Sequence, residues 1–258
     1  MSTAGLAVRQ VGYTNKAFWR NPAAAFFTFA FPIMFLIIFT TLFGNDQVQV
    51  LPHVYVHQST FYVAAMSAFA VISACYTNIA IQVTFQRDNG ILKRIRGTPL
   101  PGASYLAGRV MHAVLIGFIL VAINVAYGAI FYSATITART LPAFLVSILV
   151  GAASFAALGL AITTIIPNAD AAPAIVNASI LPILFLSDIF IPVTSSAPGW
   201  VDFVGRVFPV RHFAEAMQAA FFSPTGSGFR WGDLAVVAGW GLFGLLVAVR
   251  RFTWEPRR

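Results

Sequence analysis

Charged residues are scarce in this sequence. Asp, Glu, Lys and Arg make up 9% of the 258 residues, and only eight of them are acidic. Cysteine is scarcer still: the sequence has Cys75 alone, inside an apolar run, which excludes a disulfide framework within the chain. The sequence shows no Ser/His/Asp set and no clustered carboxylates. We therefore predict that the chain carries no catalytic site.

His53 and His57 are the residues that suggest a metal. In the stretch LPHVYVH they would fall on one side of a strand or a helix. Two histidines without a third ligand make a weak zinc site. We favour the polarity of an outer loop as the explanation and predict no metal.

Apolar residues are abundant instead. The AVILMFWYC set accounts for 59% of the chain, 25 residues are Phe, and the mean hydropathy is +0.80. A soluble domain has roughly half of its residues in this set, whereas a bilayer can cover much more apolar surface from outside. The composition predicts an all-α, polytopic membrane protein, because no β-barrel alternation is sustained.

Six segments have the roughly 20 mostly apolar residues that a membrane-spanning helix needs. The predicted transmembrane helices are 23–43, 61–83, 110–132, 141–166, 171–191 and 231–249. Pro173 and Pro182 predict kinks in the fifth. The last is rich in Gly, which suits close contact between helices. We predict that residues 23–258 form a single transmembrane domain.

The basic residues predict the orientation of these helices. An even number of spans puts both termini on one side, with twelve Lys and Arg residues, and leaves four on the other. The positive-inside rule then places the termini and the loop 84–109 in the cytoplasm, as in a bacterial-type plasma (inner) membrane. Topology thereby accounts for the net charge of +8, so we predict no nucleic-acid partner.

Two further segments are predicted to be helical outside the spans. Residues 1–22 form an amphipathic segment, which we expect to be an interfacial helix on the cytoplasmic side rather than a cleavable signal peptide. Its predicted interfacial residues are Arg9, Lys16, Trp19 and Arg20. Residues 193–222 predict two short helices dipping into the outer interface. The candidate site residues of this outer re-entrant segment are Trp200, Pro209, Arg211 and Glu215.

The loop 84–109 holds six charges in a chain that has few. A solvated, positive-inside loop is one explanation. The loop is longer than the topology requires, and Gly90, Gly97 and Pro99 flank the short basic segment ILKRIR. A compact surface that is presented to a cytoplasmic partner is the other explanation.

The stretch FQRDNGILKRIRGTPL resembles the cytoplasmic loop of type-2 ABC exporter permeases, whose pattern is roughly F-E-R-E-x-G-T-L-x-R-L-x-x-T-P. The matching residues are Arg87, Asp88, Gly90, Leu92, Arg94, Thr98 and Pro99. Gln86 and Ile91 stand where the family usually has an acid and a Thr. This departure bears on the docking contacts and not on the resemblance itself.

Two other stretches are similar to the same family. APGWVDFVGRVFPVRHFAEAM is similar to its outer segment through Pro198, Gly199, Trp200, Pro209, Glu215 and Ala216. WRNPAAAFFTFAFPIMFLIIF is similar to its opening segment through Arg20, Pro22 and Pro32. The resemblance covers almost the whole chain, and the family is that of drug- and antibiotic-exporter-like ABC permeases.

The resemblance implies a half-transporter. Two permease chains, identical or related, would meet through the first, second and fifth spans, and each would dock on a separate ABC ATPase subunit, two copies in all. The sequence has no G-x-x-x-x-G-K-[ST] motif, so the ATP and Mg would be bound by the partner and this chain would hold no cofactor. The implied ATPase-coupling residues are Arg87, Asp88, Gly90, Leu92, Lys93, Arg94, Arg96, Thr98 and Pro99.

The predicted function is ATP-driven export of a hydrophobic or amphipathic compound, such as a drug, antibiotic or lipid. Export of a polysaccharide or lipid-linked glycan is the sister possibility, and an ATP-independent carrier or channel is the rival. Asp188, Phe31 and Phe35 are candidates for the path or its gate. Hydration near the interface is the alternative for Asp188, and lipid contact or packing for the two Phe residues. Asn124, Asn177 and Ser179 are predicted to form hydrogen bonds between helices.

Overall fold

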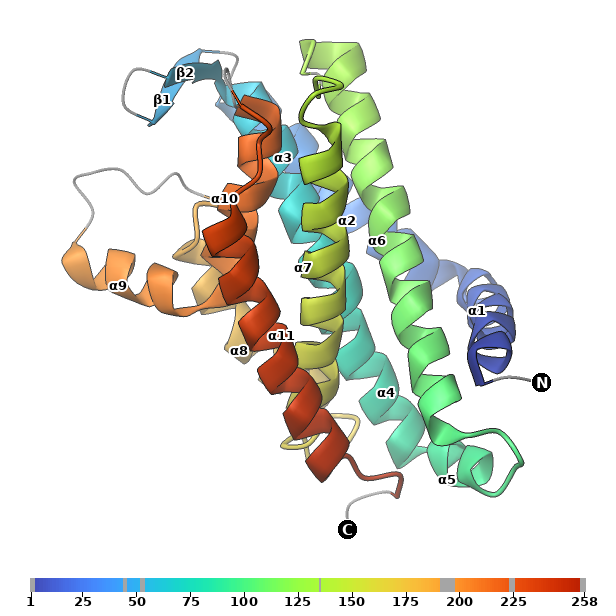
Figure 1. Cartoon of the computed structure of the whole chain (residues 1–258). Coiled ribbons are helices and arrows are strands. Elements are labelled where there is room, and N and C mark those ends of the chain that lie inside the picture. Colours follow the sequence, from blue (N-terminus) through green and yellow to red (C-terminus); the bar gives the residue numbers. More distant parts are fainter. Residues whose placement is uncertain are drawn as a thin grey trace.

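The computed structural model describes residues 3–43, 46–51, 54–134, 136–190, 198–222 and 226–255. Helices dominate this part of the chain, which confirms the predicted all-α fold. The helices are α1 (Thr3–Trp19), α2 (Pro22–Leu42), α3 (Gln58–Ile72), α4 (Asn78–Asp88), α5 (Ile91–Arg96), α6 (Gly102–Tyr132), α7 (Leu141–Ile162), α8 (Ala172–Phe185), α9 (Gly199–Val207), α10 (Pro209–Phe222) and α11 (Trp231–Arg251) (Figure 1).

Five helical segments of the described residues are long and apolar enough to cross a membrane. They are α2, α6, α7, α11 and the continuous run from α3 through the π-helical turn η1 (Ser73–Thr77) to α4. All five correspond to predicted spans, which confirms a polytopic membrane protein.

The continuous run α3–η1–α4 is the centre of the bundle. Almost every residue of α3 is buried, because α2, α6, α7 and α10 all pack against it. Gly159 of α7 lies so close to η1 that an added Cβ would be 2.8 Å from the Tyr76 carbonyl oxygen. α7 also packs closely on α11, where a Cβ at Gly241 would be 2.4 Å from the Ser154 Oγ. The Gly-rich character of the last span therefore serves helix contact, as predicted.

The fifth span, predicted as a kinked helix over 171–191, is helical over a shorter range than predicted. α8 has only 14 residues, which gives about 21 Å at 1.5 Å per residue, against the roughly 30 Å of a bilayer core. The helix ends after Phe185, and Asp188 adopts a left-handed conformation with φ of 56°. α9 then lies across the bundle, and α10 runs on toward the end that carries β1 and β2 (Figure 1).

α9 and α10 confirm that the outer segment holds two short helices separated at Pro209. Residues 193–197 of the predicted segment lie outside the described residues. α10 is more deeply placed than an interfacial helix, since it packs against α3, α7 and α11. Phe213 of α10 fits against Gly151 of α7, where an added Cβ would be 2.1 Å from the ring. The fifth crossing is thus divided between α8 and α10.

A short antiparallel hairpin between α2 and α3 was not predicted. β1 (Gln47–Leu51) pairs with β2 (Val54–His57), with Gln47 opposite His57 and an irregularity between Gln49 and Leu51. The hairpin lies at the end of the bundle opposite α5 (Figure 1). It covers the stretch LPHVYVH, in which His53 is outside the described residues.

The chain returns to the α5 end after its last helix. A Cβ at Gly102, where α6 begins, would be 2.5 Å from the Trp254 ring, so the C-terminal segment packs on the connection between α5 and α6. Figure 1 shows the C-terminus and α5 at the same end of the bundle. This arrangement agrees with the predicted topology, whereas the side of the membrane stays a prediction.

Candidate functional site

An elbow between α4 and α5 carries most of the predicted ATPase-coupling residues. Gly90 makes the turn with a φ of 71°, a left-handed conformation that suits Gly. Leu92 is fully buried and anchors α5. After the helix ends, the Thr98 hydroxyl donates a hydrogen bond to the Ile95 carbonyl oxygen. Pro99 comes next and is exposed.

The other face of α5 is basic and exposed. Lys93, Arg94 and Arg96 are all at the surface. No acidic group of the described residues lies within ion-pair distance of these three. α5 therefore presents three cations outward on a helix that is held from behind by Leu92.

Arg87 differs from the other residues of the elbow, because its side chain is inside the protein. It is 1% exposed, and its guanidinium donates to the carbonyl oxygens of Thr163 at 2.8 Å and Ile166 at 2.7 Å. Asp88 accepts a hydrogen bond from the Ala169 backbone N–H at 3.1 Å. These residues hold the connection between α7 and α8. Burial excludes Arg87 from direct contact with a partner subunit.

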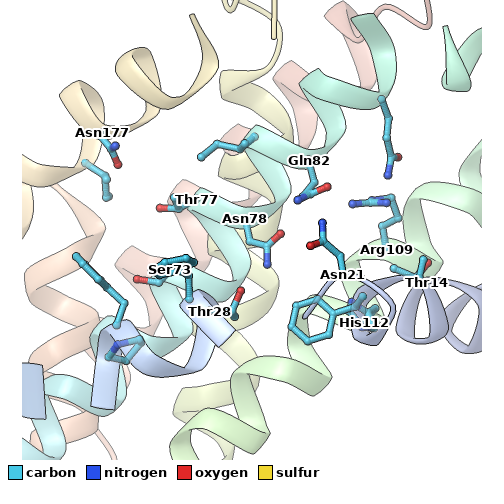
Figure 2. Close-up of a pocket in the computed structure, with 18 of the residues that line it drawn as sticks. Thr14, Asn21, Thr28, Ser73, Thr77, Asn78, Gln82, Arg109, His112 and Asn177 are labelled. Atoms are coloured by element: carbon cyan, nitrogen blue, oxygen red, sulfur yellow. The ribbon is translucent and has the colours of Figure 1, made fainter. Parts of the chain in front are cut away.

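A cavity of about 720 Å³ lies between α1, α2, the α3–η1–α4 run, α6 and α8 (Figure 2). Its polar lining residues are Gln10, Thr14, Asn21, Thr28, Ser73, Thr77, Asn78, Gln82, Gln86, Arg109, His112 and Asn177. Its apolar lining residues include Phe27, Phe31, Pro32, Phe69, Ile180, Leu181 and Leu184. Among the described residues that line it, none is acidic.

This cavity is not among the features predicted from the sequence, although the sequence carries a signal of it. Ser73, Thr77, Asn78, Gln82 and Gln86 are separated by intervals of four, one, four and four residues, which places them on one face of a helix. They interrupt the apolar character of the second span along a single stripe. A polar stripe on a long apolar helix indicates a surface that faces water, a ligand or another helix.

The turn η1 lies within this stripe. A π-helical turn inside an α-helix is rare and often occurs at a functional site. Its Tyr76 hydroxyl is 2.7 Å from the Ser179 Oγ, which itself donates to the Val176 carbonyl oxygen. Tyr76 is therefore the donor, and this bond joins the second span to α8. The predicted hydrogen bond between helices is confirmed for Ser179. Asn177 lines the cavity, and the buried amide of Asn124 has no hydrogen-bond partner among the described residues, so the prediction is wrong for Asn124.

α1 forms one wall of the cavity and packs along the first half of α6. Gly108 allows this contact, since a Cβ there would be 2.6 Å from the Gln10 Cβ. Trp19 stacks on Phe29 with 5.7 Å between ring centroids. The remaining predicted interfacial residues are Arg9, Lys16 and Arg20, all exposed. The helix is present as expected, and its place at a membrane interface stays a prediction.

Aromatic rings close the cavity toward the hairpin. Phe31 lines the cavity, but Phe35 does not. Phe35 packs against Phe69 and Phe190, with centroid distances of 6.0 and 5.7 Å. Phe39 follows one turn further along α2 and stacks on Tyr62. We call the set Phe31, Phe35, Phe39, Phe69 and Phe190 the aromatic cluster.

Asp188 lies in an ion-pair network rather than in the cavity lining. Arg211, whose side chain is 10% exposed, binds three carboxylates. These are Asp188 at 3.0 Å, Asp202 at 2.8 Å and Glu215 at 3.1 Å. Asp188 adopts a left-handed φ of 56°, a conformation that Gly adopts with less strain than other residues. The network joins the end of α8 to α9 and α10.

The same network continues to α11. Arg230 binds Glu215 at 2.6 Å and Asp233 at 2.5 Å, and the Nδ1 of His212 lies 2.7 Å from Asp233. On the exposed side, a hydrogen bond from Arg206 lowers the pKa of Asp202 below its ordinary value. Trp200 is 61% exposed and makes no contribution to these ion pairs.

Metal ligands do not gather in the described part of the chain. No group of three or more His, Cys, Asp and Glu residues there has the arrangement to hold a metal ion. His57 is exposed.

The elements described above occur in the order and spacing that the sequence resemblance implies: an N-terminal helix, a basic elbow after the second span, and a helix pair before the last span. A search of curated proteins returns no match. The sequence profile of the family described as "ABC-2 type transporter" matches residues 11–222, which is most of the chain; the match begins within α1 and includes the elbow and the helix pair. The chain belongs to the ABC-2 type transporter family and is the membrane-spanning permease component of an ABC transporter.

Proposed function

We propose that the chain is the permease subunit of an ATP-driven exporter that moves a hydrophobic or amphipathic compound out of the cytoplasm or the inner leaflet. The observation that carries this proposal is the cavity, whose lining combines hydrogen-bonding groups with aromatic and aliphatic groups. Its volume of about 720 Å³ lies in the range typical of small-molecule sites. A drug-sized amphiphile matches both its size and its polarity.

The energy for transport would enter at the elbow. The family implies an ATPase partner, which binds the ATP and Mg, and the exposed basic face of α5 is a suitable docking surface for acidic groups of that subunit. A displacement of α5 would move α4 as well. Arg87 and Asp88 would then transmit the displacement to the connection between α7 and α8. In the assembly we expect two permease chains and two ATPase subunits.

The aromatic cluster is the proposed gate. Its rings make edge-on, tilted and stacked contacts with one another and with Tyr62, and as a gate they would block the route from the cavity to the hairpin end. Transport would require Phe31 and Phe35 to separate from Phe69 and Phe190. Because α8 ends just before Phe190, a movement of α8 would act directly on this cluster.

An ion-coupled carrier fits the cavity less well. Such carriers use intramembrane acids or unwound helices to bind the coupling ion. The described lining residues of this cavity include no acid. Export of a glycan remains the sister possibility, and substrate assays can separate it from export of an amphiphile.

The proposal can be tested in inside-out vesicles that contain the chain and its ATPase partner. We expect ATP-dependent accumulation of a fluorescent amphiphile, and no accumulation with a non-hydrolysable ATP analogue. Phe31→Ala and Phe69→Ala should change the rate or selectivity of accumulation. An assembled complex that hydrolyses ATP but moves no amphiphile would contradict the proposal. Movement of a lipid-linked glycan in its place would establish the alternative.

A further inference from the structure

Two side-chain nitrogen atoms of cavity-lining residues have no hydrogen-bond partner among the described residues. The Nε of Arg109 and the Nε2 of His112 are buried, and neither has a hydrogen-bond partner among the described residues. His112 is only 6% exposed. A buried polar group without a hydrogen bond costs free energy, and a desolvated charge without a counter-ion costs more. Such a pair in a cavity is therefore expected to meet its partner in a ligand.

Arg109 and His112 line the same cavity. They are three positions apart in α6, so their side chains lie on one face of the helix. Both line the cavity at its α1 end, close to Thr14 and Asn21 (Figure 2). The ring of Phe18 packs edge-on against His112 with 5.5 Å between centroids, which fixes the imidazole on one side.

The charge of this end of the cavity is positive. Arg109 forms no ion pair with any described residue. The neighbouring lining groups are the neutral side chains of Gln82, Gln86 and Asn78. Amides and a guanidinium together suit an oxygen-rich anion, and Arg binds phosphate and carboxylate in a bidentate manner.

The cavity also has apolar walls on α2 and α8 that suit an apolar chain. Phe27, Phe31 and Leu181 belong to these walls, and all three are exposed at the molecular surface. This surface is apolar, so an amphiphile can place its tail there, whether a lipid or a second permease chain covers it. The head would then lie under α1, beside Arg109.

We propose that Arg109 and His112 form a subsite for the anionic head group, phosphate or carboxylate, of an amphiphile whose tail follows α2 and α8. This inference rests on the proposed function and gives it a substrate chemistry. The head group has two sources, an anionic lipid of the membrane or a transported amphiphile.

The test uses the full chain in phosphatidylcholine nanodiscs, without the ATPase. Isothermal titration calorimetry compares dodecyl phosphate with dodecylphosphocholine, and empty nanodiscs serve as the blank. We expect tighter binding of dodecyl phosphate. Arg109→Gln should weaken it about ten- to a hundredfold, the size of a charge-assisted hydrogen bond, and Arg109→Lys should weaken it less. His112→Gln should weaken it severalfold.

Arg250→Gln is the matched control, because it removes the same charge from an exposed position at the end of α11. Gln82→Glu is a second variant in case Arg109→Gln does not fold. It leaves Arg109 in place but adds a carboxylate to the cavity, and it should reduce dodecyl phosphate binding as well. Equal affinity for the two amphiphiles, or an equal loss in Arg250→Gln, would overturn the subsite.

A second measurement identifies the source of the head group. Native mass spectrometry counts phosphatidylglycerol molecules that stay bound when the chain is released from doped nanodiscs. A lower count in Arg109→Gln assigns the subsite to a membrane lipid, and an unchanged count with weaker dodecyl phosphate binding assigns it to a transported amphiphile. Because the ATPase is absent, a negative result would leave ATP-driven export intact. Normal binding without ATP-dependent export would count against the proposed function alone.

Discussion

Arg87 shows how a family motif residue can serve the interior of the protein. Its charge is buried and is balanced by carbonyl oxygens at the C-terminal end of α7, where the helix dipole is negative. The sequence resemblance implies that Arg87 is a coupling residue, and the structure places it in the last turn of α4. Burial, which the sequence did not reveal, makes it a positioning residue between α4 and the α7–α8 connection.

Replacing Arg87 should therefore affect stability as well as coupling. Arg87→Gln removes hydrogen bonds from a charged donor and leaves carbonyl groups of the α7 end unsatisfied, at a cost of about 2 kcal/mol. We expect a lower thermal midpoint in nanodiscs and weaker stimulation of ATP hydrolysis by substrate. Arg250→Gln, at an exposed position, should change neither. Normal stability in Arg87→Gln would contradict the structural role.

Gly151 is a second position at which a single atom matters. Its α-carbon lies against the Phe213 ring, and an added Cβ would be 2.1 Å from it. Gly151→Ala should push α10 away from α7 and destabilise the protein by about 1–3 kcal/mol, the usual cost of overpacking. Gly239→Ala is the control, because nothing lies within 4 Å of its added Cβ. Thermal unfolding measures both, and Phe213→Leu should partly rescue Gly151→Ala.

At the scale of elements, the broken fifth crossing depends on charge. Glu215 connects Arg211, which holds α8 and α9, with Arg230, which precedes α11. Removal of the Glu215 carboxylate leaves each of these two arginines with fewer partners, although Arg211 keeps Asp188 and Arg230 keeps Asp233. The network therefore keeps α10 aligned with both neighbours.

Glu215→Gln should loosen α10 from α11 without unfolding the bundle. We expect faster hydrogen exchange in α9 and α10 and little change in α3 and α7, because the apolar face of α10 remains. Asp202→Asn is a useful comparison, since the Asp202 side chain is 44% exposed against 30% for Glu215, and ion pairs at more exposed positions are worth less. Equal exchange rates in wild type and Glu215→Gln would show that packing alone holds the helix.

The elbow is the other element with a clear test. Arg94→Glu with Arg96→Glu reverses two exposed charges of α5 but leaves Leu92 and Arg87 inside. Insertion should be normal, because Arg87, Lys93 and Arg109 still mark the side as cytoplasmic. Like charges across the contact would cost several kcal/mol, so pull-down of the ATPase and substrate-stimulated hydrolysis should fail. Normal values for both would fit a solvated loop instead.

For the molecule as a whole, hydropathy predicts those features that depend on the sequence of a single helix. The five long spans follow from runs of apolar residues, which are local in the sequence. The division of the fifth crossing could not be predicted in this way, because residues 171–191 are apolar enough for a span. The break depends on the conformation at Asp188 and on the place that α10 takes between α3, α7 and α11.

The cavity was predictable only in part. The polar stripe on the second span is visible in the sequence, and Phe31 was a candidate for the path. Arg109 was counted as a topological charge, since nothing in the sequence shows that α1 folds back over α6 and buries part of its guanidinium. Contacts between distant segments decide which polar residues share a volume.

The last prediction concerns the assembly of two permease chains. The second span is mostly buried within one chain, and the face that remains accessible is the polar stripe beside α2 and α8. Two chains that meet through these elements would turn their cavities toward each other. Leu181 and Phe185 of α8 are 41% and 53% exposed and are suitable positions for cysteine, while the native Cys75 is buried.

Leu181→Cys and Phe185→Cys should therefore form cross-links between chains in membranes, because α8 would lie at the shared face. Leu246→Cys on α11 is the control: it is 56% exposed and belongs to a helix that covers the other side of α7. Gel mobility under oxidising conditions, with and without the ATPase, measures the yield. Monomers alone in nanodiscs with the ATPase present would contradict the half-transporter arrangement. Cross-links formed only by Leu246→Cys would contradict it as well, because the two chains would then meet through α11 and the cavity beside α8 would open to lipid rather than to a second chain.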